Sequence, residues 1–174
     1  MKSNKYILIL SLVIVAAFSN ILLTNIPNFS PIASVALFSG FYLSDKKLAL
    51  LIPITCMFIS DYFIGFHSLM WAVYLSFALT VVMGIKMKTS SSKSVIINSV
   101  LSSLVFFLIT NSAVWLTGGF YSSDLSGLGL CLSMGIPFFK YTLLSSIVFS
   151  ALLFGGFQIL NQLINKFLIF SKKS

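Results

Sequence analysis

The chain contains no glutamate and no arginine, and its formal charges come from three aspartates and eleven lysines. Only 8% of the residues are charged and 58% are hydrophobic, whereas about a quarter of a soluble domain is charged. This composition excludes an ordinary soluble domain. The net charge of +8 does not indicate a nucleic-acid partner, because the lysines are spread over the ends of apolar segments and do not follow one face.

The chain also lacks the motifs of metal, nucleotide and redox chemistry, with no HExxH, no CxxC and no Walker-type glycine loop. Cys56 lies in an apolar segment and Cys131 in a predicted loop, so neither a disulfide nor a thiolate metal site is predicted. A serine-hydrolase triad would need His67 beside Asp61, and the residues around His67 do not form a nucleophile elbow. We expect no cofactor and no enzymatic activity, and a small enzyme acting on lipid is the weakest alternative.

The positions of the lysines indicate the membrane topology. Four clusters are separated by long apolar stretches: Lys2/Lys5, Lys46/Lys47, Lys86/Lys88/Lys93 and Lys166/Lys172/Lys173. The alternate connections, at 25–30, 65–68 and 117–135, contain no lysine. This alternation is the positive-inside pattern of a multi-pass membrane protein. It predicts a membrane protein with both termini in the cytoplasm, where the lysines meet anionic lipid.

The apolar stretches predict an all-α protein, a single bundle of six transmembrane helices without a second domain. The predicted helices are 6–24, 31–44, 48–65, 68–85, 94–116 and 137–168. The segment 31–44 is short, because 14 residues at 1.5 Å each span about 21 Å of a roughly 30 Å hydrocarbon core. It is therefore either a short crossing helix or a re-entrant one. The last helix is longer than a bilayer needs and is expected to extend into the cytoplasm or to bend near Gly155-Gly156.

Two charged residues fall inside predicted helices, both near the outer ends. An ionisable side chain at such depth costs about 2.5–3.5 kcal/mol on insertion scales, so it should have a partner or a function. Asp61 and Lys140 have opposite signs and similar depths. They could form an ion pair between the third and sixth helices, or they could line an outward-facing pocket, and both can hold together.

The helices that begin at the outer face are a second reason to expect a pocket. Their first turns carry free N–H groups and partial positive charge. Ser30 with Pro31, then Ser68, and then Pro137 mark the predicted starts. If these starts converge beside Lys140, they form a site suited to a carboxylate or a phosphate.

Polar and aromatic residues at this depth complete the predicted pocket. The candidate substrate-binding residues are Asn28, Phe29, Ser30, Asp61, His67, Trp71, Asn111, Trp115 and Lys140. The segment 28–30 would form a lid, Asp61 would hold a polar or cationic group, and Lys140 would hold an anionic group. The asparagine on the fifth helix would hydrogen-bond the substrate, and the tryptophans would stack on a flat ring. Alternatively, the tryptophans belong to an aromatic belt and the histidine is an ordinary interfacial residue.

These motifs together resemble a known kind of protein. The series is Asn28–Pro31, Ala36–Gly40, Pro53 with Ser60-Asp61, Gly65–His67, Thr110-Asn111 with Trp115, Gly127-Leu128 and Ile136–Phe139. It resembles a bacterial family of small multi-pass membrane proteins of unknown function, over about residues 25–155. That family looks similar to the substrate-binding S components of energy-coupling-factor (ECF) vitamin transporters. The resemblance implies six helices, an outward pocket closed by the loop after the first helix, and partners comprising one transmembrane coupling protein and two ATPases.

The sequence is therefore consistent with two functions. The first is a substrate-capture subunit for uptake of a small metabolite. The second is a non-transporting accessory subunit that packs against a larger membrane complex, with the polar cluster as a structural brace. S components typically carry small residues at four-residue spacing on the first helix, and this chain has Ala16-Ala17 instead, so the coupling partners stay open. A cavity of about 300 Å³ or more would favour binding.

Overall fold

The computed structural model describes residues 26–171 without a gap and, before them, residues 7, 9–11, 13–15, 18, 19, 22 and 23. These described residues form helices and connecting segments, with no strand. The elements are α2 (Ile32–Tyr42), α3 (Lys46–Ile64), α4 (Met70–Lys86), α5 (Ser92–Thr117), α6 (Leu125–Ser150), the π-helical turn η1 (Ala151–Gly155) and α7 (Gly156–Ser171). Much of the expected first helix, 6–24, lies outside the described residues.

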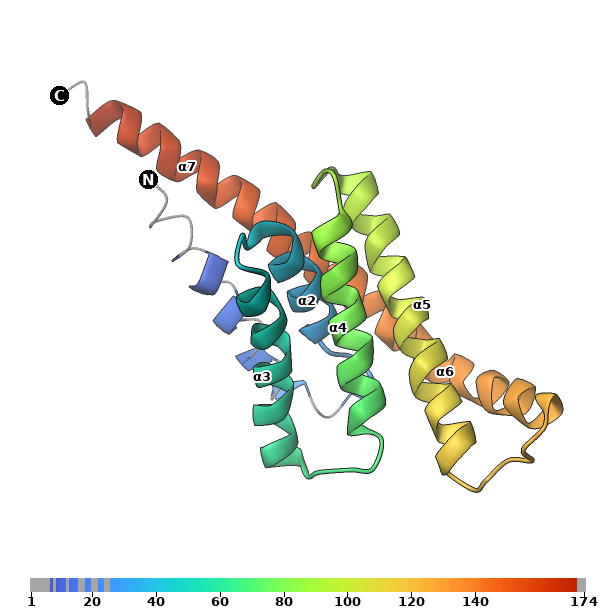
Figure 1. Cartoon of the computed structure of the whole chain (residues 1–174). Helices are drawn as coiled ribbons and strands as arrows, with labels where there is room; N and C mark the ends of the chain where they lie inside the picture. Colours follow the sequence, from blue (N-terminus) through green and yellow to red (C-terminus); the bar gives the residue numbers. More distant parts are fainter. Residues whose placement is uncertain are drawn as a thin grey trace.

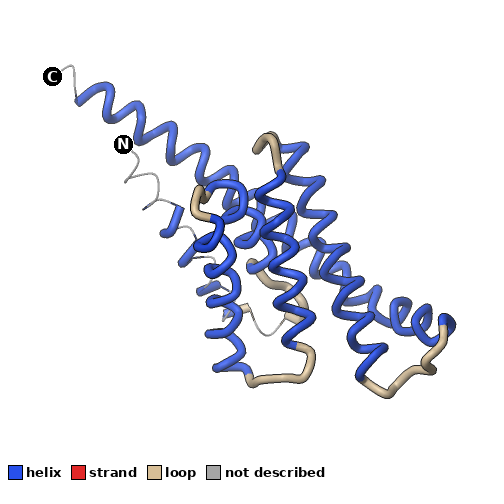
Figure 2. The backbone as a smooth tube through the Cα atoms, in the orientation of Figure 1, coloured by secondary structure: helices blue, strands red, loops and turns tan. Residues whose placement is uncertain are grey.

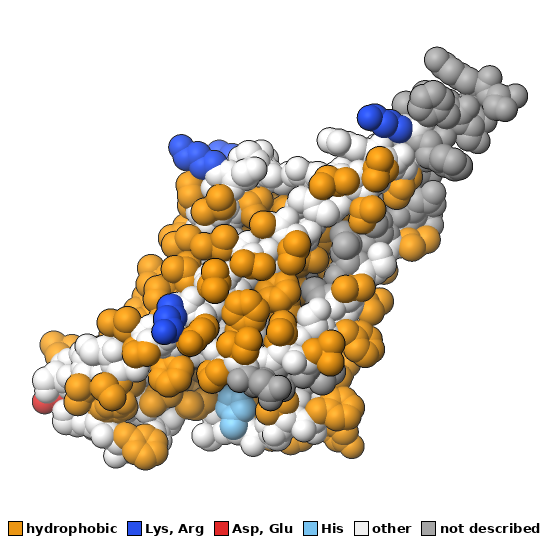
Figure 3. Space-filling model, turned by 180° about the vertical axis from the view of Figure 1, so that it is seen from behind, with side chains coloured by type: hydrophobic (Ala, Val, Ile, Leu, Met, Phe, Trp, Pro, Cys, Tyr) orange, Lys and Arg blue, Asp and Glu red, His pale blue; other side chains and the backbone are white. Residues whose placement is uncertain are grey.

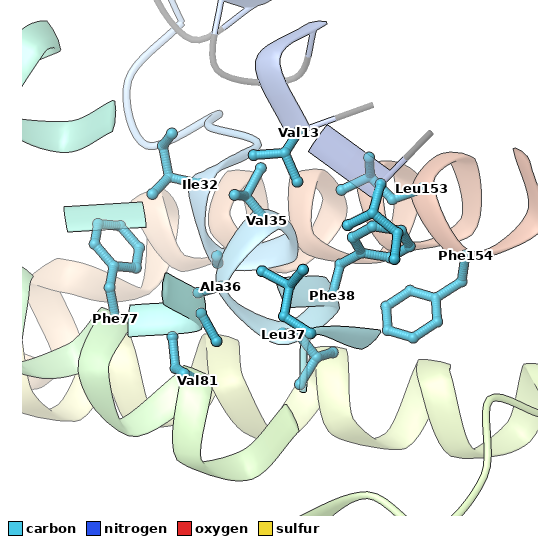
Figure 4. Packing of buried hydrophobic residues seen from close by; sticks show 14 of the residues in the cluster. Val13, Ile32, Val35, Ala36, Leu37, Phe38, Phe77, Val81, Leu153 and Phe154 are labelled. Carbon is cyan, nitrogen blue, oxygen red and sulfur yellow. The ribbon is translucent and has the colours of Figure 1, made fainter. Parts of the chain in front are cut away.

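Helix α2 is the centre of the bundle. It is apolar on every side, and its residues from Ile32 to Gly40 are all buried, which is what a helix without a polar face requires. Figure 4 shows its side chains surrounded by residues of other elements, including Phe77, Val81 and Phe154. Its 11 residues extend about 16 Å, so it cannot cross a roughly 30 Å core alone.

Two glycines let α2 and α4 approach closely. A methyl group added to Gly40 would collide with the Val81 carbonyl and lie 3.1 Å from the Cα of Gly84. One added to Gly84 would collide with the Leu37 carbonyl. Small residues at such crossings are typical of helices packed within a membrane. The two glycines thus permit the close packing of α2 against α4.

Three other glycines make no such close contact. An added methyl would meet nothing within 4 Å at Gly65, Gly155 or Gly156. Gly65 has a φ of 116° and ends α3, because this left-handed conformation is easily adopted only without a side chain.

Three segments are long and apolar enough to cross a membrane, namely Lys46–Ile64, Ser92–Thr117 and the continuous run Leu125–Lys166. Helices α2 and α4 are apolar but shorter. Within the described residues there are thus three candidate spans, against the six predicted for the whole chain. The long third run contains the π-helical turn η1 directly before Gly156, at the place where a bend was one of the two expectations.

The surface of the bundle is unusually apolar, and its interior contains many serines beside the apolar core around α2. Large apolar side chains are exposed along α3, α4, α5 and α6, including Phe63 at 69% and Met134 at 60%, and Figure 3 shows one face covered mostly by hydrophobic side chains. The buried polar residues are mostly serines, such as Ser76 and Ser99, whose hydroxyls donate to carbonyls of their own helix at 2.7 and 2.8 Å. This arrangement suits a chain surrounded by lipid.

The lysine alternation becomes a separation in space. Figures 1 and 2 show the α2–α3 and α4–α5 connections at one end of the bundle, and the α3–α4 and α5–α6 connections at the other. The first two connections adjoin the lysines at 46, 47, 86, 88 and 93, whereas residues 65–69 and 118–124 contain no lysine. We call the second end the lysine-free end. Helix α7 projects beyond the bundle at the opposite side (Figure 1).

The start of α6 differs most from the prediction. The expected outer loop 117–135 shrinks to 118–124, so Pro137 lies inside α6 and Cys131 is buried in the helix, not in a loop. Asp124 begins the helix, because its Oδ1 accepts the Gly127 N–H at 2.8 Å and the hydroxyls of Ser122 and Ser126 at 2.7 and 2.8 Å. These hydrogen bonds, of which the one from the Gly127 N–H contributes most, lower the Asp124 pKa to about 2.

The other two predicted outer starts fit only in part. The Ser30 hydroxyl accepts the Ile32 N–H at 3.2 Å, as expected of a cap, while Pro31 is the N-cap residue and not the first helical one. Helix α4 begins at Met70 without a side-chain cap, so the capping predicted for Ser68 was wrong.

Candidate functional site

A cavity of about 380 Å³ lies at the lysine-free end. Its walls come from residues 23 and 26–30, the last turns of α3, the first half of α4, and the facing parts of α5 and α6. A second cavity of about 230 Å³ adjoins it and shares Asn28, His67, Val73, Phe106 and Thr142. The short buried α2 contributes Ala33, from its first turn, to the larger cavity.

The structure divides the nine predicted binding residues into two groups. Asn28, Phe29, Ser30, Asp61 and His67 line the larger cavity. The smaller cavity is lined by two of these, Asn28 and His67, and also by the asparagine of α5 at position 111. The remaining three, at positions 71, 115 and 140, are in the walls of neither cavity.

Asp61 is the charged residue in these walls. Its side chain is 3% exposed, and its Oδ2 accepts a hydrogen bond of 2.6 Å from the hydroxyl of the half-buried Tyr74. No lysine of the described residues lies within ion-pair distance of it. The buried carboxylate therefore has a neutral donor and no counter-ion there, an arrangement that is unfavourable unless something else compensates the charge.

Lys140 does not form the predicted ion pair. It is exposed, and its Nζ lies 4.9 Å from the centroid of the neighbouring Tyr141 ring. The cavity residue Thr142 follows two positions later on α6, and two residues in a 3.6-residue helix differ by about 200°, so the two side chains point to opposite faces. The ion-pair interpretation was wrong for this geometric reason.

The predicted anion site at converging helix starts does not form either. The α6 residues in the cavity walls begin at Gly135, well after the helix start at Leu125. Neither this start nor Lys140 belongs to the cavity. Of the three helix starts predicted to converge, the cavity keeps only the residues that precede α2 and α4.

The segment before α2 covers the cavity in an ordered turn. Asn28 has a φ of 59°, a left-handed conformation that asparagine tolerates better than most residues. The Phe29 N–H donates to the Ile26 carbonyl at 3.2 Å, and the Phe29 ring packs edge-on against Phe149 of α6 at 5.7 Å. Phe29 of the predicted lid is thus held against α6.

The serines of α6 were missed by sequence reasoning. Ser146 lines the larger cavity and is 1% exposed, and its Oγ has no hydrogen-bond partner. Its carbonyl accepts the hydroxyl of Ser34 at 3.0 Å, and the Ser145 hydroxyl donates to the Thr142 carbonyl at 3.0 Å. The spacing of Thr142 and Ser146, four residues apart on one helix face, was the available signal.

Three predicted residues are bound elsewhere or held by their own helix. The Trp115 Nε1 donates to the Ser122 carbonyl at 2.8 Å and so fixes the α5–α6 connection, while Trp71 is 49% exposed, as in an aromatic belt. Asn111 donates to the carbonyl of Phe107 at 2.8 Å and keeps its Oδ1 beside Gly135. The aromatic side chains in the larger cavity are instead those of positions 29, 77 and 106.

The described residues contain no group of three His, Cys, Asp or Glu that could hold a metal ion. A family model described as a family of unknown function (DUF6580) matches residues 1–167. No curated protein and no solved structure matches the chain.

Proposed function

The chain belongs to the DUF6580 family of unknown function, and we propose that it is a substrate-capture membrane subunit for uptake of a small metabolite. It takes the metabolite into the cavity at its lysine-free end, in the manner of the ECF S components that its motifs resemble. The protein itself performs no reaction on the substrate.

The volume of the cavity carries this proposal. At about 380 Å³, it falls within the range of roughly 300–1,000 Å³ that small-molecule sites occupy. Its walls are largely apolar with a few polar groups, Asp61 and Ser146 among them, which is the composition such sites share. A purely structural brace would not need this space, because its polar residues would pair directly with one another.

The direction of uptake follows from the lysines. We place the lysine-bearing end of the bundle in the cytoplasm of a bacterium and the lysine-free end at the outer face of the inner membrane. Both termini then lie in the cytoplasm, and the cavity lies on the side from which a nutrient arrives. The segment 26–30 would serve as the lid.

The energy for uptake would come from partners, because the sequence has no nucleotide-binding motif. A transmembrane coupling protein with ATPases is the partner set that the resemblance suggests. The projecting α7 (Figure 1) is available for such a contact, since it exposes Ile159, Leu160 and Leu163.

The same exposed face on α7 also favours the second candidate, an accessory subunit of a larger membrane complex. In that case α7 is the docking surface and the cavity holds no metabolite.

Native mass spectrometry of the protein purified from its own host in mild detergent separates the two. A bound metabolite, with or without ATPase subunits, supports substrate capture, and ATPase subunits would identify the energy source. A stoichiometric large complex that carries no metabolite would overturn substrate capture in favour of the accessory role.

A further inference from the structure

Among the described residues, the walls of the larger cavity carry one formal charge, and that charge is negative. These residues include Asp61 but no lysine, and the chain has no arginine. His67 is the other titratable side chain among them, and it is exposed, whereas Asp61 is 3% exposed. A ligand that enters this cavity therefore meets a buried acceptor group with no cation of the described residues beside it.

Asp61 receives few hydrogen bonds from the described residues. An ionised carboxylate can accept about four hydrogen bonds, and the described side chains and backbone supply one, from Tyr74 to Oδ2. The second oxygen, Oδ1, has no donor among the described residues. A positively charged N–H donor is the group that best satisfies such an oxygen.

Ser146 provides an independent observation on a different helix. Its hydroxyl is buried and unpartnered, while the neighbouring buried hydroxyls of Ser145 and Ser150 donate to protein acceptors at 3.0 and 3.1 Å. Buried polar groups without a partner are rare, and each one in a cavity wall points to a group that completes it. A ligand acceptor atom would do so.

The rest of the wall is apolar and partly aromatic. Phe29, Phe77 and Phe106 come from the lid, α4 and α5, and Met57 comes from α3. Such side chains favour a flat apolar body, and aromatic faces attract a cation.

We propose that this cavity binds a small organic cation with an aromatic or other apolar body, whose ammonium-type N–H groups bond to Asp61 and whose acceptor atom receives the Ser146 hydroxyl. The inference rests on the proposed function and gives it a substrate class. It excludes an anionic substrate, since Lys140, the predicted anion-binding residue, lies outside the walls.

The test compares four matched probes by titration calorimetry on the full-length protein in detergent at pH 7. The probes are 2-(quinolin-3-yl)ethylamine, 2-(quinolin-3-yl)ethanol, quinolin-3-ylacetate and 2-(naphthalen-2-yl)ethylamine. The first three share one ring and carry a positive, a neutral and a negative group, and the fourth keeps the ammonium but lacks the ring acceptor. We expect the quinoline amine to bind at least about tenfold more tightly than the alcohol or the acid.

Variants identify the residues that cause the preference for the amine. Asp61→Asn should abolish the preference for the amine over the alcohol. Asp124→Asn makes the same chemical change at the N-cap of α6, outside the cavity, and should keep the preference. Ser146→Ala should reduce the advantage of the quinoline amine over the naphthalene amine, by about threefold, without removing the preference for the positive charge.

Three results would overturn the inference: the alcohol or the acid binding as tightly as the amine, the preference surviving in folded Asp61→Asn, or none of the probes binding at about 1 mM. The comparison of charges on the unaltered protein decides the matter even if Asp61→Asn fails to fold. A neutral or anionic metabolite that co-purifies with the protein would also reject the cation while leaving substrate capture standing.

Discussion

The hydroxyl of Tyr74 is the residue-scale reason that a carboxylate can stay buried at position 61. It is a donor to Asp61 across the α3–α4 contact, at 2.6 Å. Sequence reasoning offered two roles for Asp61, an ion pair with Lys140 or a place in an outward-facing pocket. The structure places Asp61 in the cavity wall with a neutral donor, and no described residue compensates its negative charge.

Tyr74→Phe is expected to destabilise the folded protein by about 1.5–3 kcal/mol, because it removes a hydrogen bond to a charged group and leaves the acceptor buried. Thermal unfolding in detergent measures the change. Tyr62→Phe is the matched control, since Tyr62 is 68% exposed and its replacement should change little. Equal stability of the two variants would show that the bond to Asp61 contributes nothing.

Ser146→Ala should leave the stability of the ligand-free protein unchanged or raise it slightly, because the lost hydroxyl has no partner. Ser34→Ala should lower it by about 1 kcal/mol. The Ser34 hydroxyl donates to the Ser146 carbonyl and accepts from the hydroxyl of Ser150. A marked loss of stability in Ser146→Ala would mean that its hydroxyl is already satisfied within the protein.

At the scale of elements, the contact between α2 and α4 decides the shape of the bundle. The central helix is too short to span the membrane and is held by neighbours on all sides, so its position depends on close packing. The glycines at positions 40 and 84 supply that approach, and a composition or hydropathy argument sees only their small size.

Gly84→Ala is expected to destabilise the protein by about 1–3 kcal/mol, because the added methyl collides with the Leu37 carbonyl and the backbones must separate. Gly156→Ala adds the same methyl where nothing lies within 4 Å and is the control. Thermal unfolding of both variants is the measurement. The expectation fails if Gly84→Ala is no less stable than the control.

The N-terminal cap of α6 predicts a dependence on pH. The Asp124 pKa is lowered to about 2 by the backbone N–H and the hydroxyl groups that donate hydrogen bonds to its carboxylate. Because the pKa is lower in the folded protein, the ionised cap stabilises the fold at any pH above the ordinary aspartate pKa of about 3.9. This stabilisation is lost as the pH falls towards about 2. The cap is therefore complete at neutral pH.

Asp124→Ala should speed hydrogen exchange of the first backbone amides of α6 at pH 7, since the Gly127 N–H then loses its acceptor. Asp124→Asn should raise the exchange rate of these amides less than Asp124→Ala does, or not at all, because asparagine is also a good N-cap. Exchange measured by mass spectrometry on peptides from this region compares the two. Unchanged exchange in Asp124→Ala would contradict the capping role.

At the scale of the whole molecule, the separation of lysine-bearing and lysine-free ends is the property that sets orientation. The α2–α3 and α4–α5 connections lie at one end of the bundle (Figure 1), and lysines adjoin both of them. The cavity lies towards the other end. The proposed direction of uptake depends on which of these ends faces the outside.

Cysteine accessibility tests this orientation. In a variant without Cys56 and Cys131, a cysteine at Ser68 is expected to react with a membrane-impermeant maleimide added to intact cells. A cysteine at Thr89 should react only after the membrane is opened. Each site is the control of the other, and the reverse pattern would place the lysines outside and contradict the proposed uptake.

The sequence by itself determined the all-helical class, the apolar surface and the alternation of charge, because these depend on composition and on order along the chain. It also indicated the residues at the lysine-free end that meet in the cavity, such as Asn28 and Asp61, since depth in a membrane follows from position within a span.

Only the tertiary structure decided which residues share the site. The register of α6 turns Lys140 away from the cavity and Ser146 towards it, because six positions along a helix change the face by about 240°. The bond from Tyr74 to Asp61 and the burial of the short α2 likewise depend on how helices cross. Such crossings arise from packing between segments far apart in the sequence, which no local pattern records.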